Sequence, residues 1–297
     1  MTPVGYRRSV FALRFSRAGL LLFAVSLTAS CASQYVNQLS QVSANSTSFH
    51  MPTELGSDAC RSALSQAAAS EDNELDASNI RLVNWNVHKQ TGQNWKHDYD
   101  KLASGTDLVL IQEASLRTES INDIDATMHW SFAPGYRTSG EITGVLTLSR
   151  IKPLVQCSFV NLEPVLRTPK ATSITQYGLS GTDETLVVVN VHAVNITLGM
   201  GAYRNQFKQI EETLSQHSGP IILSGDFNTW RARRAELVEE LVSRLGLTEL
   251  QFADDNRVRF LGQALDHIYV RGLSAVKTNT SQVETSDHNP MSVTFSL

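Results

Sequence analysis

Cysteine is scarce in this chain, with three copies among 297 residues. None of them forms a Cys-x-x-Cys spacing, which argues strongly against a thiolate zinc site. Cys31 lies in the N-terminal segment, so Cys60 and Cys157 are the pair that could form a disulfide if the chain is exported.

An excess of positive charge is also absent. Lys and Arg number 25 against 29 Asp and Glu, which gives a net charge of −4. A protein that holds long nucleic acid by neutralising its phosphates would usually be more basic. Arg231, Arg233 and Arg234 could still form a local basic patch that binds phosphates. A solvated helix face explains the same cluster equally well.

No apolar run is long enough to span a bilayer comfortably as a helix. The longest, from Ala18 to Leu27, follows four arginines and precedes small residues and Cys31. This pattern predicts an export signal over residues 1–31. Leu27 to Cys31 resembles a bacterial lipobox, in which the cysteine is lipidated. Ordinary cleavage and an uncleaved signal anchor are the alternatives, so we expect a periplasmic or membrane-anchored protein.

Residues 32–57 are rich in Ser, Gln, Asn and Thr and lack hydrophobic periodicity. We therefore predict a tether over residues 32–78, with a possible short helix from Asp58 to Ala69. From residue 79 to residue 297, alternating and helical apolar patterns follow one another without a further linker, which predicts one globular domain.

Polar side chains follow several of the predicted strands. The clearest case is Ile221 to Leu223, which runs into Gly225, Asp226 and Asn228. Residues two apart on an extended backbone face the same side, so this Asp and Asn can act on one ligand. One such residue is more often a turn or a cap than a catalytic group. Six further residues occupy similar positions, at Asn86, Glu113, His192, Asp266, Asp287 and His288.

The residue types in this set suit phosphoryl chemistry. Glu113 with Asn86 suits a hard cation that keeps water ligands, such as Mg²⁺ or Mn²⁺. Asp226 and Asn228 suit the activation and positioning of a water molecule. A bound metal ion and a positioned water are what hydrolysis of a phosphoester requires.

The two histidines fit the same chemistry. Asp266 could orient His288 by accepting its ring proton. His192 could contact a phosphate oxygen or help to stabilise a leaving group.

Short motifs of this chain occur in the order typical of the endonuclease/exonuclease/phosphatase superfamily, and the chain resembles that superfamily over residues 80–297. The motifs are Asn84-Trp85-Asn86-Val87, Gln112-Glu113, Asn190-Val191-His192, Gly225-Asp226-Phe227-Asn228, Leu265-Asp266-His267 and Ser286-Asp287-His288-Asn289-Pro290. The residues in several of these motifs look most similar to those of the YafD-like bacterial branch. The resemblance implies a deoxyribonuclease I-like α/β fold, a four-layer α/β/β/α sandwich with the site at one end of two packed sheets.

The resemblance also implies residue roles. It makes Glu113 the main metal ligand, helped by Asn86 and Asp287. It makes His192, Asp226, Asn228, Asp266 and His288 the catalytic set. One departure is His88, which stands where abasic-site endonucleases carry an Asp that helps to bind metal.

These observations together predict an exported, Mg²⁺-dependent phosphoesterase that uses a water activated at Asp226 or His288. The expected substrate is a phosphodiester, either nucleic acid or a phospholipid headgroup or other small phosphodiester. We expect a monomer that meets the membrane through its N-terminal signal or lipid anchor. The alternative is a catalytically silent envelope binding or scaffold protein on the same fold.

Overall fold

The computed structural model describes the chain except for residues 1–48, 51–52, 55, 69–72, 117–126 and 138–140. The predicted export signal and the first part of the predicted tether therefore lie outside the described residues. Residues 46–297 form one compact unit. No helix among the described residues combines the length and the apolar character needed to cross a membrane.

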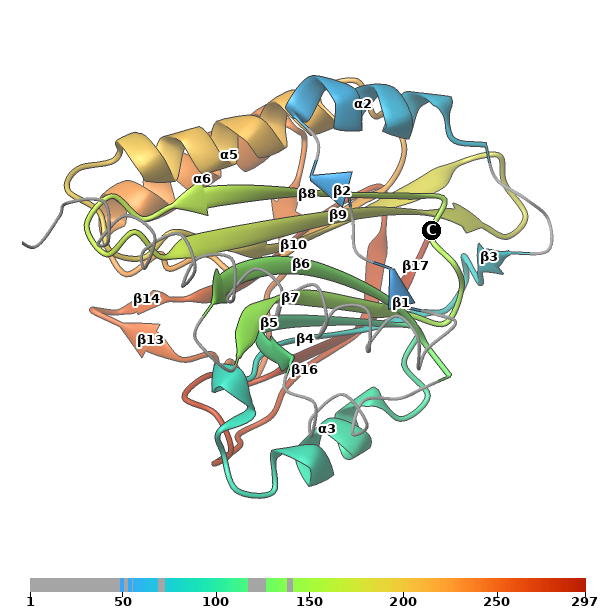
Figure 1. Cartoon of the computed structure of the whole chain (residues 1–297). Coiled ribbons are helices and arrows are strands. Elements are labelled where there is room, and N and C mark those ends of the chain that lie inside the picture. Colours follow the sequence, from blue (N-terminus) through green and yellow to red (C-terminus); the bar gives the residue numbers. More distant parts are fainter. Residues whose placement is uncertain (1–48, 51–52, 55, 69–72, 117–126, 138–140) are drawn as a thin grey trace, which may run out of the picture. The chain divides into compact units, whose positions relative to one another are not determined.

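Two mixed β-sheets form the centre of this unit (Figure 1). The first sheet has seven strands, in the order β1 (Phe49–His50), β6 (His129–Arg137), β7 (Ile142–Ser149), β5 (Leu108–Leu116), β4 (Ile80–Asn86), β17 (Met291–Ser296) and β16 (Ser274–Thr280). Strands β4 and β5 run parallel, so their carboxyl ends meet at one edge.

The second sheet has eight strands, in the order β12 (Thr248–Glu249), β15 (Asp266–Arg271), β11 (Ile221–Asp226), β10 (Thr185–His192), β9 (Pro169–Leu179), β8 (Val155–Leu162) and β2 (Thr53–Glu54), with β3 (Glu74–Leu75) also paired to β9. Strands β10 and β11 run parallel. A separate hairpin joins β13 (Arg259–Phe260) to β14 (Gln263–Ala264).

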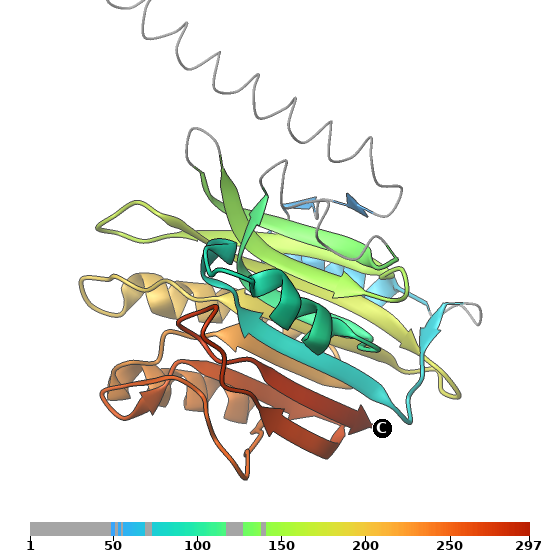
Figure 2. The ribbon, with the colours of Figure 1, turned by 90° about the horizontal axis from the view of Figure 1, so that it is seen from below.

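Helices cover the outer face of each sheet. Helices α2 (Ser57–Gln66), α5 (Gly201–Leu214) and α6 (Ala232–Arg244) lie over the second sheet in Figure 1. Helix α3 (Trp95–Ala103) lies against the first sheet, as Figure 2 shows from below, and a short 3₁₀ turn, η1 (His88–Gln90), follows β4. This four-layer arrangement confirms the predicted α/β fold class.

Two hydrophobic cores hold the layers together. The apolar stripe of α5, including Phe207 and Ile210, packs with Val189 of β10. A second core, which includes Leu110 of β5 and Val188 of β10, lies between the sheets. Successive side chains of a strand point to opposite faces, so the nearly unbroken apolar run of β10 serves both cores.

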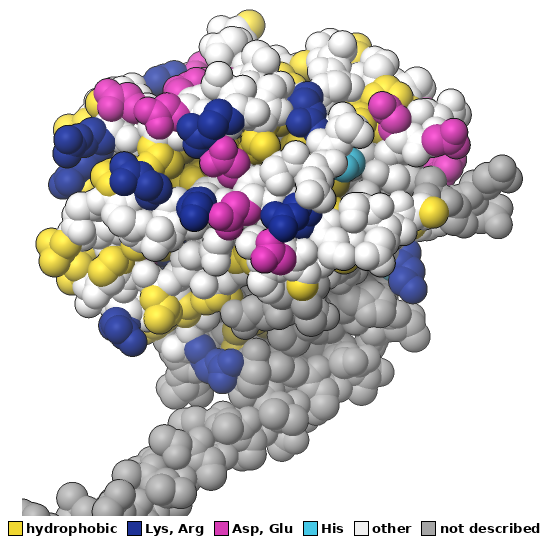
Figure 3. All heavy atoms as spheres, turned by 90° about the horizontal axis from the view of Figure 1, so that it is seen from above, with side chains coloured by type: hydrophobic (Ala, Val, Ile, Leu, Met, Phe, Trp, Pro, Cys, Tyr) yellow, Lys and Arg dark blue, Asp and Glu magenta, His cyan; other side chains and the backbone are white. Residues whose placement is uncertain are grey.

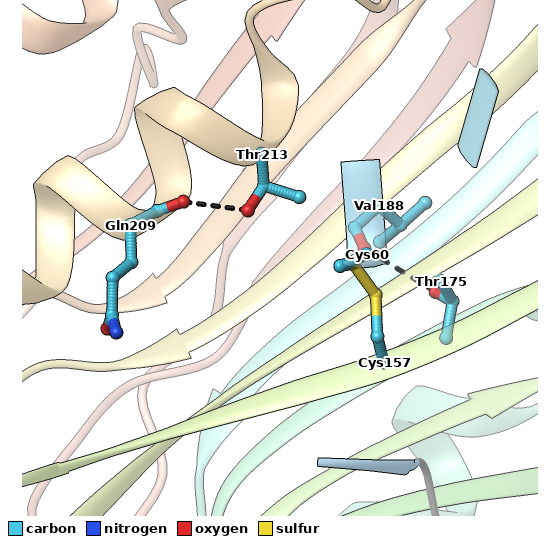
Figure 4. Close-up of a disulfide and its surroundings, with 6 residues drawn as sticks. All are labelled: Cys60, Cys157, Thr175, Val188, Gln209 and Thr213. Carbon is cyan, nitrogen blue, oxygen red and sulfur yellow. Dashed lines mark hydrogen bonds between the residues drawn. A yellow bond between two sulfur atoms is a disulfide. The ribbon is translucent and has the colours of Figure 1, made fainter. Parts of the chain in front are cut away.

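The predicted helix after residue 57 is present and is part of the compact unit. Figure 4 shows Cys60 of α2 bonded to Cys157 of β8, with their Cα atoms 6.0 Å apart. The compact unit therefore begins before the boundary predicted at residue 79, because a disulfide and strand pairing hold this segment to the second sheet. Asp58 lies within the first turn of α2 and is not its N-cap, which is Gly56.

Strands β8 and β16 do not stand out in the sequence. Strand β16 exposes most of its side chains, and β8 is half-buried at several positions. Neither strand therefore shows a clear alternation between apolar and polar residues, which is the signal that sequence reading relies on.

Candidate active site

Three predicted site residues form one row across the second sheet. His192 at the end of β10 pairs with Asp226 at the end of β11, and Asp226 pairs with Asp266 at the start of β15. Their side chains are all buried. The backbone pairing of these strands therefore sets the spacing of one imidazole and two carboxylates, independently of contacts between their side chains.

Glycine is required beside this row. Gly225 has φ +147°, and a Cβ atom there would lie 1.9 Å from the carbonyl oxygen of Val191 on the neighbouring strand. A side chain would both clash and strain the backbone. The close approach of β10 and β11 at Gly225 is what brings His192 and Asp226 side by side.

The first sheet adds two residues, one at the end of β4 and one at a bulge within β5. Asn86 ends β4, and its Nδ2 donates a hydrogen bond to Asp226 Oδ2 at 3.1 Å. Glu113 lies in β5 at a register irregularity and has φ +54°. Such a bulge redirects a side chain, and Glu113 Oε1 comes within 3.7 Å of His192 Nε2.

His288 closes the site from the loop before β17. Its Nδ1 lies 2.6 Å from Asp266 Oδ2, and its Nε2 lies 3.9 Å from Asp226 Oδ2. Burial opposes the protonation of His288, but the charges of Asp266 and Asp226 outweigh it and raise the pKa to about 10. The imidazole is therefore positively charged at neutral pH.

Asp226 is the carboxylate at the centre of the site. Burial raises its pKa to about 6, against the opposing charge of His288. Its Oδ1 accepts a hydrogen bond from the backbone N–H of Asn228 at 2.9 Å, while the Asn228 side chain donates to the carbonyl of Ala193. Asp226 is thus ionised above about pH 6 and is held on both oxygens.

His192 is neutral and has a cationic neighbour that the sequence did not reveal. Burial lowers its pKa well below the ordinary value, and the charge of Lys170 adds to that effect. Lys170 Nζ lies 2.8 Å from His192 Nε2. An ammonium can only donate, so this ring nitrogen accepts, and the short distances from His192 to Glu113 and Asp226 are not ion pairs.

A hydrated divalent ion fits beside Glu113. Its carboxylate is partly exposed and lines the pocket. Asn86 ends the neighbouring strand β4, and its amide oxygen accepts the backbone N–H of His88. The described part of the chain contains no group of three or more His, Cys, Asp or Glu side chains arranged to hold a metal. An ion here would therefore take most of its ligands from water and phosphate oxygens, as Mg²⁺ commonly does.

Asp287 stands apart from the other predicted residues. Its side chain is 62% exposed, and its Oδ1 lies 3.7 Å from Nδ1 of His88 rather than beside Glu113. Its role as a metal ligand stays a prediction. The structure brings the other seven predicted residues to one end of the two sheets.

A buried polar network supports the site from behind. His267 Nδ1 lies 2.7 Å from Glu249 Oε1, and its Nε2 lies 2.8 Å from Thr229 Oγ1. Arg257 donates to the same Glu249 oxygen at 2.8 Å. His267 follows Asp266, and Thr229 follows Asn228, so the network connects the two loops that carry these site residues.

The site borders a pocket of about 320 Å³, which Glu113 and His192 line but Asp226 and His288 do not. Its walls include Glu113, His192, Lys170 and Lys89. That volume is enough for a phosphoryl group with a small organic substituent. A second pocket, of about 300 Å³, borders α2 near Arg61 and contains none of the predicted site residues.

The family model of the endonuclease/exonuclease/phosphatase family matches residues 83–288. The chain belongs to this family. Members of the endonuclease/exonuclease/phosphatase family are generally phosphoesterases and generally use divalent metal ions. The matched region runs from β4 to His288 and so includes every predicted site residue.

Relatives and solved structures agree with this assignment. A UPF0294 protein of Vibrio vulnificus (strain YJ016) is 38% identical over 236 residues, which cover 78% of this chain and 81% of the relative. A UPF0294 protein of Yersinia enterocolitica is 36% identical over 219 residues, 73% of this chain and 83% of the relative. These bacterial relatives support the predicted YafD-like branch.

Among solved structures, the human Nocturnin catalytic domain with bound sulfate is similar with a TM-score of 0.56 and 16% identity, covering 75% of this chain and 96% of that one. An endonuclease/exonuclease/phosphatase protein from Beutenbergia cavernae has a TM-score of 0.56 and 14% identity, covering 74% of this chain and 72% of that one. Both show the shared fold.

Proposed function

We propose that this protein is a metal-dependent phosphodiesterase in which Asp226 removes the proton from the attacking water. The observation that carries the proposal is the contact between two buried groups of opposite character, Asp226 and His288, beside a pocket with a lysine. Asp226 has a pKa of about 6, whereas His288 has a pKa of about 10. Such separation of pKa values assigns the acid and base roles of a site.

Each side chain of the site has a separate role in the proposed reaction. Ionised Asp226 accepts the proton of water, and Asn86 and Asn228 hold its two oxygens in place. Charged His288 faces the negative charge that develops on the phosphoryl group and, at neutral pH, does not act as a base. A divalent ion at Glu113 would supply further neutralisation of the phosphate oxygens.

Lys170 gives the pocket a fixed positive charge. One of its three ammonium hydrogens points to His192, which leaves two for a phosphate oxygen. Arg234, in contrast, is not available to substrate, because it is buried and donates to the carbonyls of Val194 and Asn228. The basic patch considered from the sequence is thus reduced to Arg231 and Arg233.

We also propose that the protein works outside the cytoplasm as a monomer, held near the membrane by its N-terminal signal or by lipidation of Cys31. Two observations support this proposal. Residues 1–31 have the pattern of an export signal, and Cys60 and Cys157 form a disulfide, which persists mainly in oxidising compartments.

Hydrolysis of bis(p-nitrophenyl) phosphate by the purified full chain tests the proposed reaction. We expect turnover with Mg²⁺ or Mn²⁺, loss of turnover with a chelator, and recovery when the ion is restored. Asp226→Asn and His288→Gln should each lower kcat by about a hundredfold or more. Asp183→Asn, in an exposed turn between β9 and β10, is the matched control. Full turnover by Asp226→Asn would refute the mechanism, and ligand binding without turnover on any phosphoester would favour a silent binding protein.

A further inference from the structure

Large apolar side chains are exposed mainly around the pocket. Of the ten such residues among the described part of the chain, eight lie on loops and strand ends at the site end of the sheets. Leu198 is 86% exposed and Leu261 is 76% exposed. We call the eight the apolar rim: Tyr136, Leu162, Val165, Leu166, Ile196, Leu198, Phe260 and Leu261.

The loops that carry most of the rim are fastened to one another. The buried carboxylate of Glu163, at the end of β8, accepts hydrogen bonds from the backbone N–H groups of Asn195 (2.6 Å) and Ile196 (3.2 Å). Trp230 Nε1 donates to Asn195 Oδ1 at 2.9 Å, and the Trp230 ring lies edge-on to Phe260. The β8–β9 turn, the β10–α5 loop and the β13–β14 hairpin therefore present one continuous edge.

This edge leads directly into the pocket. Three rim residues, Tyr136, Leu166 and Ile196, line the same pocket as His192 and Lys170. One wall of the pocket is therefore apolar, while its inner end carries the groups that suit a phosphate. A substrate with a phosphoryl group at one end and an apolar part at the other matches this division.

The loops that carry most of the rim have few acidic side chains at their surface. Residues 162–168, 193–200 and 257–264 contain a single acid, Glu163, and that side chain is buried. The same segments expose Arg167 and Arg259, of which Arg259 is paired with Asp255, two residues before the third segment. Arg231 lies over the neighbouring Trp230 ring. This contrasts with the net charge of −4 for the whole chain. Figure 3 shows hydrophobic and basic side chains along the left edge, with acidic side chains at its upper end. In Figure 1 this edge is the end where β8 turns into β9.

We propose that the apolar rim rests on an anionic lipid surface and that the substrate is an amphiphilic phosphoester drawn from that surface. Exposed leucines and isoleucines with flanking arginines are what such a surface binds. Single-stranded nucleic acid is favoured by aromatic faces, but six of the eight rim residues are aliphatic. The part of the proposal that concerns the substrate rests on the proposed hydrolytic function, whereas the lipid contact does not.

The lipid contact is tested with a fluorophore on the full chain. In a Cys31→Ser background, Leu198→Cys is labelled with an environment-sensitive dye, and Val276→Cys, on β16 and 68% exposed, is the matched control. On phosphatidylglycerol vesicles with brominated acyl chains, we expect a blue shift and quenching at residue 198 and little change at residue 276. Equal responses at the two positions, or none at residue 198, would overturn the proposal.

The substrate is tested with charge substitutions outside the pocket. Leu198→Asp and Leu261→Asp should each slow hydrolysis of a vesicle-borne phospholipid by about tenfold or more. Their hydrolysis of soluble bis(p-nitrophenyl) phosphate should stay unchanged. The control variant Val276→Asp should hydrolyse both substrates at the unchanged rate. Lipid hydrolysis that is unaffected, with DNA cleavage reduced instead, would assign the rim to nucleic acid and overturn the proposal. Lipid contact without turnover of any phosphoester would overturn the proposed function and leave the rim's contact supported.

Discussion

Lys170 is the site residue whose removal separates phosphate binding from proton transfer. Its ammonium lies against neutral His192 at the start of β9 and lines the pocket. Replacing it by methionine keeps the length of the side chain and removes the charge. Asp226 and His288 keep their mutual contacts in the variant, so we expect the substrate to bind more weakly while the chemistry of the bound substrate changes less.

The size of the effect follows from the strength of the hydrogen bond that the ammonium would donate to a phosphate oxygen. A hydrogen bond from a charged group contributes about 1.5–3 kcal/mol, which corresponds to about 10- to 100-fold in kcat/KM for Lys170→Met. Most of the change should appear in KM. Lys170→Arg should recover part of it because the charge is retained.

The assay compares kcat and KM for bis(p-nitrophenyl) phosphate with the inhibition constant of inorganic phosphate, at fixed Mg²⁺. Lys277→Met, on the exposed strand β16, controls for loss of a lysine elsewhere. Thermal unfolding checks that Lys170→Met is folded. Unchanged KM and unchanged phosphate inhibition in a folded Lys170→Met protein would refute the reasoning.

Three further predictions concern the framework of the site. Gly225→Ala should destabilise the protein by about 3 kcal/mol or more, because the backbone strain adds to a clash with the neighbouring strand; an unchanged midpoint of thermal unfolding would contradict this. Serine at both Cys60 and Cys157 should lower stability by about 2–5 kcal/mol, since the disulfide closes a long loop over a sequence separation of 97 residues; urea unfolding with and without reductant measures the loss. Burial opposes the charge of Glu249, but the hydrogen bonds and charges of His267 and Arg257 together outweigh it and lower the pKa to about 2. Its contribution to stability is therefore complete above about pH 4.5 and is lost as the pH falls toward 2. Glu249→Gln should flatten that part of the stability profile measured by urea unfolding, and an identical profile would exclude the contact as its source.

Much of the candidate site could be predicted because several of its residues follow apolar runs that form strands. Asp226 follows an apolar run and a glycine, and Glu113 follows another apolar run, so each is visible as a change from hydrophobic to polar sequence. The order of the motifs then predicted that these residues lie together in one site. The alignment of His192 with Asp226 and Asp266 became visible only from the strand register.

Other contributions were not visible because they depend on packing between distant segments. Lys170 begins a strand instead of ending one, and only its cross-strand position beside His192 gives it meaning. The antiparallel pairing of β9 with β10 supplies that position, because its register places residue 170 near His192. The charge of His288 likewise depends on the positions of Asp266 and Asp226 around it, and sequence alone left it as a candidate base.

The apolar rim shows a different limit of sequence reading. Leu166 and Leu198 are ordinary leucines in the sequence, and the segments that carry them look like connecting loops. Their significance arises from exposure, which a hydrophobic residue in a sequence does not reveal. The buried Glu163 is equally misleading, because a lone acid in a turn suggests solvent contact.

The bond between Cys60 and Cys157 has a mechanical consequence. Helix α2 is the first helix that the structure describes, and this bond joins it to strand β8, which precedes the turn that begins the rim. A pull on the N-terminal end of the chain reaches that strand through a covalent crosslink, so the helix cannot peel away from the sheet first. A force on α2 is thus carried to the β8 side of the catalytic end by a covalent bond as well as by hydrophobic packing.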